Sequence, residues 1–233
     1  KTPFQTNYSI NGHIIEQVTN MKDLGVIVSK DLSWTRHIES IVSQANKTLG
    51  LIKRICKDVK NVQTRRTLYC ALVRSKLEYA SNVWSPYTIK HKLLIENVQR
   101  RATRFILNYP KDMCYKERLQ KINLLPLEFR REISDLILLF KAKYNLISLD
   151  ITKHVCTFNP GYKSRNYDKN DFHLIIKHNQ NYFRESYFVR SAKLWNILPP
   201  EIKSSDILAS FRTRVINLYK SKLITYELPS ISY

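Results

Sequence analysis

Apolar side chains recur at three- and four-residue steps through the chain between Trp34 and Tyr144. This spacing places them on one face of an α-helix, whereas a strand brings every second residue to one face. The pattern predicts helices over residues 34–55, 62–84, 88–107 and 127–144. The connections between the first three are short, which favours an antiparallel bundle. With only 4 glycines in 233 residues, a turn-rich all-β fold is disfavoured and a mainly α protein is expected.

Short β elements are expected before the first helix. Asn11 and Gly12 lie between two apolar runs, and this dipeptide tolerates the positive φ angles of a two-residue type I′ turn. The sequence therefore predicts a β-hairpin. A third, β-branched run from Leu24 to Val28 extends it to a three-stranded element over residues 6–29, since two strands alone are marginal in water.

The last third of the chain changes character. Polar residues gather at 159–165, where we predict a domain boundary. A strand is expected over 172–177 and helices over 187–195 and 208–218, which makes a small α+β region. A Leu-Pro-Pro sequence ending at Pro200 separates the two helices.

Net charge is the unusual property of the composition. The chain has 39 Lys and Arg against 19 Asp and Glu, a formal charge of +20, whereas solubility needs only about 2 to 8. Residues 47–104 hold fourteen basic and three acidic side chains, so the excess lies on the predicted bundle. Such a surplus repels itself unless a polyanion neutralises it. Nucleic acid is the expected partner, and a merely solvated basic surface is the alternative.

The basic residues of the second and third predicted helices have the spacing needed to follow a phosphate backbone. Arg100 and Arg104 lie one helical turn apart, with Arg101 beside them. Each phosphate they neutralise would release counterions, so binding should weaken steeply with salt. The candidate nucleic-acid-binding residues are Arg65, Arg66, Arg74, Lys76, Lys90, Lys92, Arg100, Arg101 and Arg104.

Aromatic residues interleave with these cations. Such side chains stack on bases or sugars in nucleic-acid sites, but at helical spacing among apolar neighbours they more often fill a core. We expect core positions for Trp34, Tyr79 and Trp84. For Tyr69 and Tyr87, stacking and packing both stay open.

No catalytic residue and no metal site is predicted. The chain has no glycine-rich phosphate loop or nucleophile elbow, and no two of its 9 aspartates are adjacent. Two-metal phosphoryl transfer needs acidic residues gathered at one site. No C-x-x-C occurs, and the residues with metal-ligating side chains late in the chain lack zinc-finger or knuckle spacing: His154, Cys156, His173 and His178. We therefore expect neither an enzyme, on its own, nor a resident cofactor.

Three groups of segments carry a recognisable pattern. The first group is Met21–Val26, Leu32–Trp34 and His37–Ile38; the second is Ala71–Ser81, Val83–Pro86, Ile95–Glu96 and Val98–Arg101; the third is Ser191–Ile202 and Ser210–Arg212. Together they resemble jockey-like non-LTR retrotransposon reverse transcriptases. In that family the first group follows the catalytic palm, the second belongs to the thumb and the helices after it, and the third is a C-terminal signature.

This resemblance implies a division of the chain into three parts. Residues 1–30 would be the end of the palm, with a primer-grip-like β element that contains Asp23, Leu24, Gly25 and Val26. Residues 31–150 would form a thumb-like helical bundle, and residues 151–233 a C-terminal α+β region. The family's metal-binding aspartates would lie upstream of Lys1. The chain is therefore expected to be a fragment, with Mg²⁺ required only together with the missing palm.

Two alternative functions, from different classes of protein, are considered. In the first, the chain is a non-catalytic part of an RNA-directed DNA polymerase that grips RNA, an RNA–DNA hybrid or DNA by backbone contacts, beside the upstream palm. In the second, it is a degenerate or co-opted helical protein-interaction module. An apolar run of about 18 residues is lacking, so no membrane partner is expected. The scattered cysteines fit a reduced intracellular compartment, the nucleus or the cytoplasm.

Overall fold

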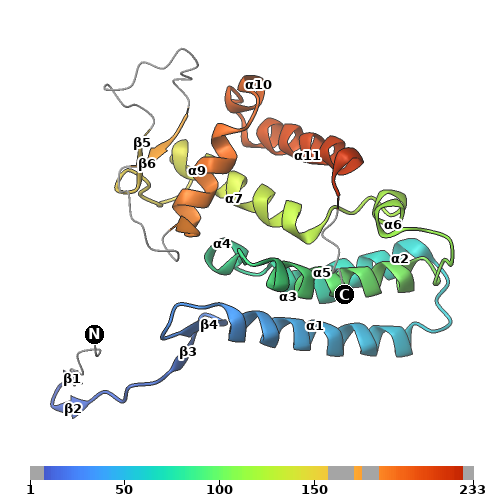
Figure 1. Ribbon diagram of the computed structural model, residues 1–233, viewed down its shortest axis with the longest axis horizontal. Coiled ribbons are helices and arrows are strands. Elements are labelled where there is room, and N and C mark those ends of the chain that lie inside the picture. The colour runs from blue at the N-terminus through green and yellow to red at the C-terminus, as the bar shows by residue number, and fades with distance from the viewer. Residues whose placement is uncertain (1–7, 157–170, 175–183, 228–233) are drawn as a thin grey trace.

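The computed structural model describes residues 8–156, 171–174 and 184–227. Helices make up most of these residues, and the strands form two-stranded antiparallel sheets (Figure 1). The predicted mainly α fold with small β elements is therefore confirmed. The predicted boundary at 159–165 and His178 lie outside the described residues.

The first hairpin forms where the Asn-Gly dipeptide predicted it. β1 (Ser9–Ile10) pairs with β2 (His13–Ile14), and both turn residues have positive φ, 51° at Asn11 and 81° at Gly12. Asparagine and glycine tolerate this left-handed conformation better than other residues. The prediction of a hairpin at this place is confirmed.

The third predicted strand does not join this sheet. Instead, β3 (Asn20–Asp23) pairs with β4 (Val26–Ser29) in a second, separate hairpin, so the three-stranded arrangement is wrong. Leu24 and Gly25, expected to begin a strand, form the turn with φ of 44° and 88°. Gly25 permits the backbone to reverse here, which ends one strand and starts the next.

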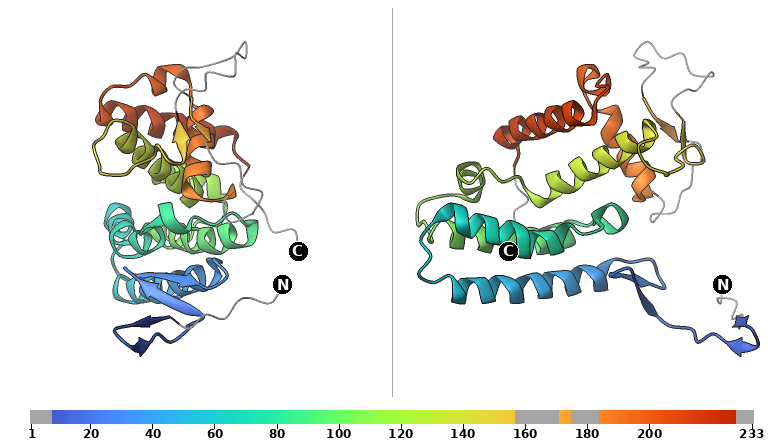
Figure 2. Two further views of the ribbon diagram at one scale, coloured as in Figure 1. Left: turned by 90° about the vertical axis from the view of Figure 1, so that its left-hand side faces the viewer. Right: turned by 180° about the vertical axis from the view of Figure 1, so that it is seen from behind.

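The helical layers stack on one another (Figures 1 and 2). α1 (Thr35–Ile55) packs against α5 (Ile89–Ile106) and against one continuous helix of three parts. Those parts are α2 (Val62–Leu68), the π-helical η1 (Tyr69–Arg74) and α3 (Ser75–Glu78), called the central helix below. The predicted helices over 34–55 and 88–107 are confirmed. The one predicted over 62–84 is interrupted at Ala80, whose φ is 51°, before α4 (Ser81–Trp84).

A second group of helices covers the bundle on the side away from α1. α7 (Leu127–Lys143) contacts the bundle through α4 and α5, and it also contacts the later helices α9 (Tyr187–Asn196) and α11 (Leu208–Thr225). The predictions of these three helices are confirmed. The remaining elements are α6 (Tyr115–Lys121), α10 (Pro200–Lys203), and β5 (Val155–Cys156) paired with β6 (His173–Leu174). No helix in the described ranges is both long and apolar enough to cross a membrane.

The expected aromatic core is partly right. Trp84 is fully buried and donates its indole N–H to the Tyr79 carbonyl at 2.7 Å, and Tyr69 is also fully buried. Trp34 is half-buried at the edge of the core. The prediction for Tyr79 is wrong, because this residue is 57% exposed. This aromatic side chain lies on the surface, at the end of the central helix, and does not enter the core.

A buried carboxylate joins the two groups of helices. Asp135 of α7 is fully buried and accepts hydrogen bonds from Asn82 of α4 at 2.8 Å and from Arg190 Nε of α9 at 2.6 Å. Arg190 also donates to the Asn82 carbonyl at 2.8 Å. A buried charge is costly unless it is paired and hydrogen-bonded, and here α4 and α9 supply the partners of the α7 carboxylate.

Replacing Asp135 with alanine should therefore destabilise the fold by about 3 kcal/mol, because it leaves the Arg190 guanidinium without its anion in a mostly buried position. Guanidinium chloride denaturation followed by circular dichroism would measure this. The matched control is Asp58→Ala, at an exposed aspartate whose side chain makes no hydrogen bond or ion pair with the described residues, and it should leave the midpoint unchanged. Equal stabilities of wild type and Asp135→Ala would contradict the role of this ion pair.

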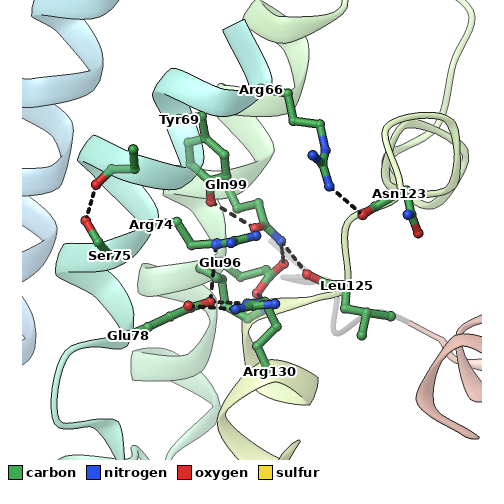
Figure 3. A network of polar contacts seen from close by, with 12 residues as sticks. Arg66, Tyr69, Arg74, Ser75, Glu78, Glu96, Gln99, Asn123, Leu125 and Arg130 are labelled. Atoms are coloured by element: carbon green, nitrogen blue, oxygen red, sulfur yellow. Dashed lines mark hydrogen bonds and ion pairs between the residues drawn. The ribbon is translucent and has the colours of Figure 1, made fainter. Parts of the chain in front are cut away.

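A second buried polar network fixes the start of α7 (Figure 3). Glu96 of α5 accepts hydrogen bonds from the Tyr115 hydroxyl and from the Leu127 backbone N–H, the latter at 2.9 Å. Gln99 accepts from the Tyr69 hydroxyl at 2.8 Å and donates to Glu96 at 3.1 Å. Burial raises the pKa of Glu96 above its ordinary value, although these hydrogen bonds act in the opposite direction.

A raised pKa in the folded state means that folding favours the protonated form of Glu96. The stabilisation it gives is fully present below the ordinary pKa of about 4.3 and is lost as the pH rises through the folded value. Measured against Glu96→Gln, which cannot titrate, the wild type should therefore lose relative stability between pH 4 and neutrality. Denaturation at a series of pH values would test this, with the exposed Glu227→Gln as control; a difference that is constant with pH would contradict it.

Candidate nucleic-acid interface

The turn of the second hairpin lies against the end of the central helix. The Tyr79 hydroxyl donates to the Leu24 carbonyl at 2.9 Å, and a Cβ placed on Gly25 would lie 3.4 Å from Tyr79 Cε1. Glycine is favoured at position 25 by its positive φ, while the Tyr79 ring packs at ordinary contact distance beside it. These contacts hold the hairpin beside the helix that carries several of the predicted cations.

A cleft of about 430 Å³, the hairpin cleft, opens between the second hairpin, α1 and the central helix. It contains two lysines, Lys22 and Lys76, whose ammonium groups make no hydrogen bond or ion pair with the described residues. Its remaining lining residues are Gly25, Ile27, His37, Ser40, Ile41, Gln44, Ser75 and Tyr79.

His37 is a buried residue that lines the hairpin cleft. Its Nδ1 accepts the Ile27 backbone N–H at 3.2 Å, and its ring meets the edge of Trp84 at 5.1 Å between centroids. Burial lowers the pKa of His37, which keeps the ring neutral at physiological pH. Since Nδ1 is the acceptor, the neutral ring carries its proton on Nε2. His37 thereby links β4 to α1 and orients the hairpin.

The four residues predicted to be primer-grip-like do not share one environment. Asp23, Leu24 and Gly25 are exposed, and Leu24 is 84% exposed at the tip of the turn. Val26 is buried in the hydrophobic core at 5% exposure. The exposed turn is available to a ligand, whereas Val26 anchors the strand.

Arg65 is buried, whereas the prediction requires it to lie on the surface. It is only 3% exposed, and its guanidinium donates to the carbonyls of Val59 at 2.5 Å and Phe105 at 2.8 Å. It also stacks over the Phe105 ring at 4.6 Å. These contacts tie the α1–α2 connection to the end of α5, so Arg65 has no free face for a phosphate.

Three predicted arginines lie on the last turns of α5. Arg101 and Arg104 are exposed, and Arg101 donates to Asn46 of α1 at 2.8 Å. Arg100 is half-buried, with its guanidinium 5.0 Å from the Tyr115 ring centre. Arg118 of α6, which the sequence did not single out, lies close by. Burial and the nearby charge of Arg104 lower the pKa of Arg118, so this cluster is short of negative charge.

The other predicted cations are distributed over separate surfaces. Lys90 is exposed in the first turn of α5, whereas Lys92 is paired with Glu128 of α7 at 2.6 Å. Arg66 and Arg74 line a different cleft, of about 560 Å³, between the central helix, α7 and α11. The structure therefore does not bring the nine predicted residues together into one stripe.

No family model matches the chain, and no curated protein or solved structure matches it significantly.

The placement of Arg65 makes it separable from the surface cations by mutation. Arg65→Lys should destabilise the fold by about 2 to 3 kcal/mol, because an ammonium group cannot reproduce the planar guanidinium that reaches the Val59 and Phe105 carbonyls together and stacks over the Phe105 ring. It should leave the salt dependence of nucleic-acid binding unchanged under folding conditions, since the charge never faces the ligand. Denaturation would measure the first effect and fluorescence anisotropy the second. A shallower salt slope in the variant would show that Arg65 does contact a phosphate of the nucleic acid.

Proposed function

We propose that this chain binds nucleic acid through phosphate contacts and acts as the thumb-like, non-catalytic part of a retrotransposon reverse transcriptase. The observation that supports it most is the hairpin cleft, which brings the exposed Gly25 turn, predicted as primer-grip-like, to the same cleft as Lys76 of the predicted thumb. The resemblance of the sequence to jockey-like reverse transcriptases supports the same reading.

The chemistry of the hairpin cleft suits a sugar-phosphate backbone. Lys22 and Lys76 supply positive charge that the described residues do not neutralise, and the absence of a side chain at Gly25 lets a strand approach the backbone closely. The exposed Tyr79 ring adds an aromatic surface beside them. Contacts of this kind follow shape and charge and do not read bases, which is what a polymerase thumb requires.

In this proposal the chain works beside a palm that supplies the metal-binding carboxylates and, with them, Mg²⁺. RNA, an RNA–DNA hybrid or DNA is the ligand, in the nucleus or the cytoplasm. The carboxylates Glu96 and Asp135 are buried and hydrogen-bonded within the fold. These two side chains hold helices in place and are not available to bind a metal ion.

A protein-interaction module is the second candidate, and one observation favours it. The β1–β2 hairpin extends away from the helical layers (Figure 1) and exposes apolar side chains, among them Ile10 at 64% and Ile14 at 73%. Exposed apolar groups of this kind mark protein contacts. In the polymerase reading they face the palm; in the alternative they face an unrelated protein.

The proposal predicts salt-dependent binding that the hairpin-cleft lysines determine. For duplex DNA, the double variant Lys22→Gln/Lys76→Gln should reduce the slope of log affinity against log salt by about 1.8, because each lost phosphate contact removes about 0.9. Fluorescence anisotropy with single-stranded RNA, duplex DNA and an RNA–DNA hybrid would measure the slopes.

The matched control is Lys60→Gln/Lys193→Gln, which removes the same charge from exposed positions outside the described clefts. It should leave the slope close to that of the wild type. Negligible binding by the wild type at low salt would exclude the nucleic-acid function and favour the protein-interaction module. Equal losses in both variants would mean that only net charge matters and that the hairpin cleft is not a site.

A further inference from the structure

A strongly basic cleft lies on the other side of the central helix from α1. This basic cleft, of about 560 Å³, is bounded by the central helix, α7 and α11. It contains six cations and a single carboxylate, that of Glu78. The six cations are Arg66, Arg74, Arg130, Lys141, Arg212 and Lys220.

Half of these cations are held in place by the fold (Figure 3). Arg66 donates to the carbonyls of Ile122 at 2.7 Å and Asn123 at 3.3 Å. Both carboxylate oxygens of Glu78 accept hydrogen bonds from Arg130. Glu78 Oε1 also lies 3.6 Å from Arg74 Nε. One carboxylate therefore faces two guanidinium groups, which leaves the wall positive and preorganised.

The other three cations have no such partner. The charged groups of Lys141 of α7 and of Arg212 and Lys220 of α11 make no hydrogen bond or ion pair with the described residues. A neighbouring cleft shows that this imbalance is local. Around Asp135 and Arg190, three cations face four carboxylates, so that surface is neutralised internally. The basic cleft, in contrast, keeps a surplus of positive charge that the described residues do not neutralise.

We propose that the basic cleft is a second phosphate-binding subsite, which takes consecutive phosphates of the nucleic-acid strand; this inference rests on the proposed function. The lining is cationic, so an apolar ligand does not fit. One phosphodiester brings a single negative charge, whereas the cleft has five more cations than anions. Several phosphates in a row match this surplus. The guanidinium group of Arg212, which makes no hydrogen bond with the described residues, can bind a phosphate with two parallel hydrogen bonds, while the arginines held by the fold add positive charge to the wall.

The two clefts lie on opposite faces of the central helix. Arg74 lines the basic cleft, and Lys76, two residues later, lines the hairpin cleft. A helix with its side chains is only about 10–12 Å across, so a strand needs few nucleotides to reach from one cleft to the other. The same nucleic acid can therefore contact both clefts by straddling this helix, which favours a strand over an acidic peptide.

The test uses the full chain and the triple variant Lys141→Gln/Arg212→Gln/Lys220→Gln, which leaves the hydrogen-bonded arginines intact. On single-stranded RNA, each lost contact should lower the salt slope by about 0.7, and three contacts by about 2. Between about 50 and 200 mM salt, the wild type should then lose roughly 20-fold more affinity than the variant. Anisotropy with labelled RNA measures this.

Two comparison variants make the outcome specific. Lys60→Gln/Lys121→Gln/Lys193→Gln removes three charges from exposed positions outside the basic cleft and should keep most of the wild-type slope. Lys141→Arg/Arg212→Lys/Lys220→Arg keeps the charge and should keep the slope. Circular dichroism checks that every variant is folded.

The results separate failure of this inference from failure of the proposed function. If the wild type binds RNA with a steep slope and the basic-cleft variant behaves as the exposed control does, the subsite is refuted while the proposed function stands. If the wild type does not bind RNA, both are refuted. Binding of polyglutamate in place of RNA, lost in the same variant, would overturn the subsite in favour of an acidic protein partner.

Discussion

The fixed position of the central helix is the constraint on which both candidate sites depend. Its buried face packs against α1 and α5, while Glu78 at its end binds Arg130 of α7. Just beyond, Tyr79 holds the Leu24 carbonyl of the hairpin. A partly buried, bidentate arginine–carboxylate pair combines geometry with strength, unlike a solvated surface pair. Because one helix forms a wall of both clefts, a shift of this helix would alter them together.

The helices could be predicted from the sequence because each carries an apolar face long enough to show its period. α6 could not, since Tyr115–Lys121 spans too few residues and begins at Cys114, an uncommon N-cap whose sulfur accepts the Glu117 N–H. The second hairpin was misjudged for a related reason. Its Leu-Gly pair looks like the start of an apolar strand, yet Gly25 adopts the positive φ of a turn.

The candidate site was harder to predict, because charge along a chain does not tell which cations have partners. Arg65 and Arg66 are neighbours in sequence, but Arg65 is buried under carbonyls while Arg66 lines the basic cleft. Arg212 and Lys220 were not singled out, since they lie outside the segment where basic residues are dense. They join Arg66 and Arg74 only through the packing of α11 across α7. Such long-range proximity has no local sequence signal.

Under the proposed function, two clefts on one helix would let the protein hold a nucleic acid without a continuous basic stripe. Once one cleft is occupied, the second phosphate contact becomes intramolecular, with an effective concentration set by the short length of strand between the clefts. Two modest sites then combine to a higher affinity without any new contact. The buried pair of Asp135 and Arg190 contributes indirectly, because it joins α7 to α4 and α9 and so limits movement of the walls. Preformed walls reduce the entropy lost on binding, which is the condition under which contacts to phosphates alone suffice.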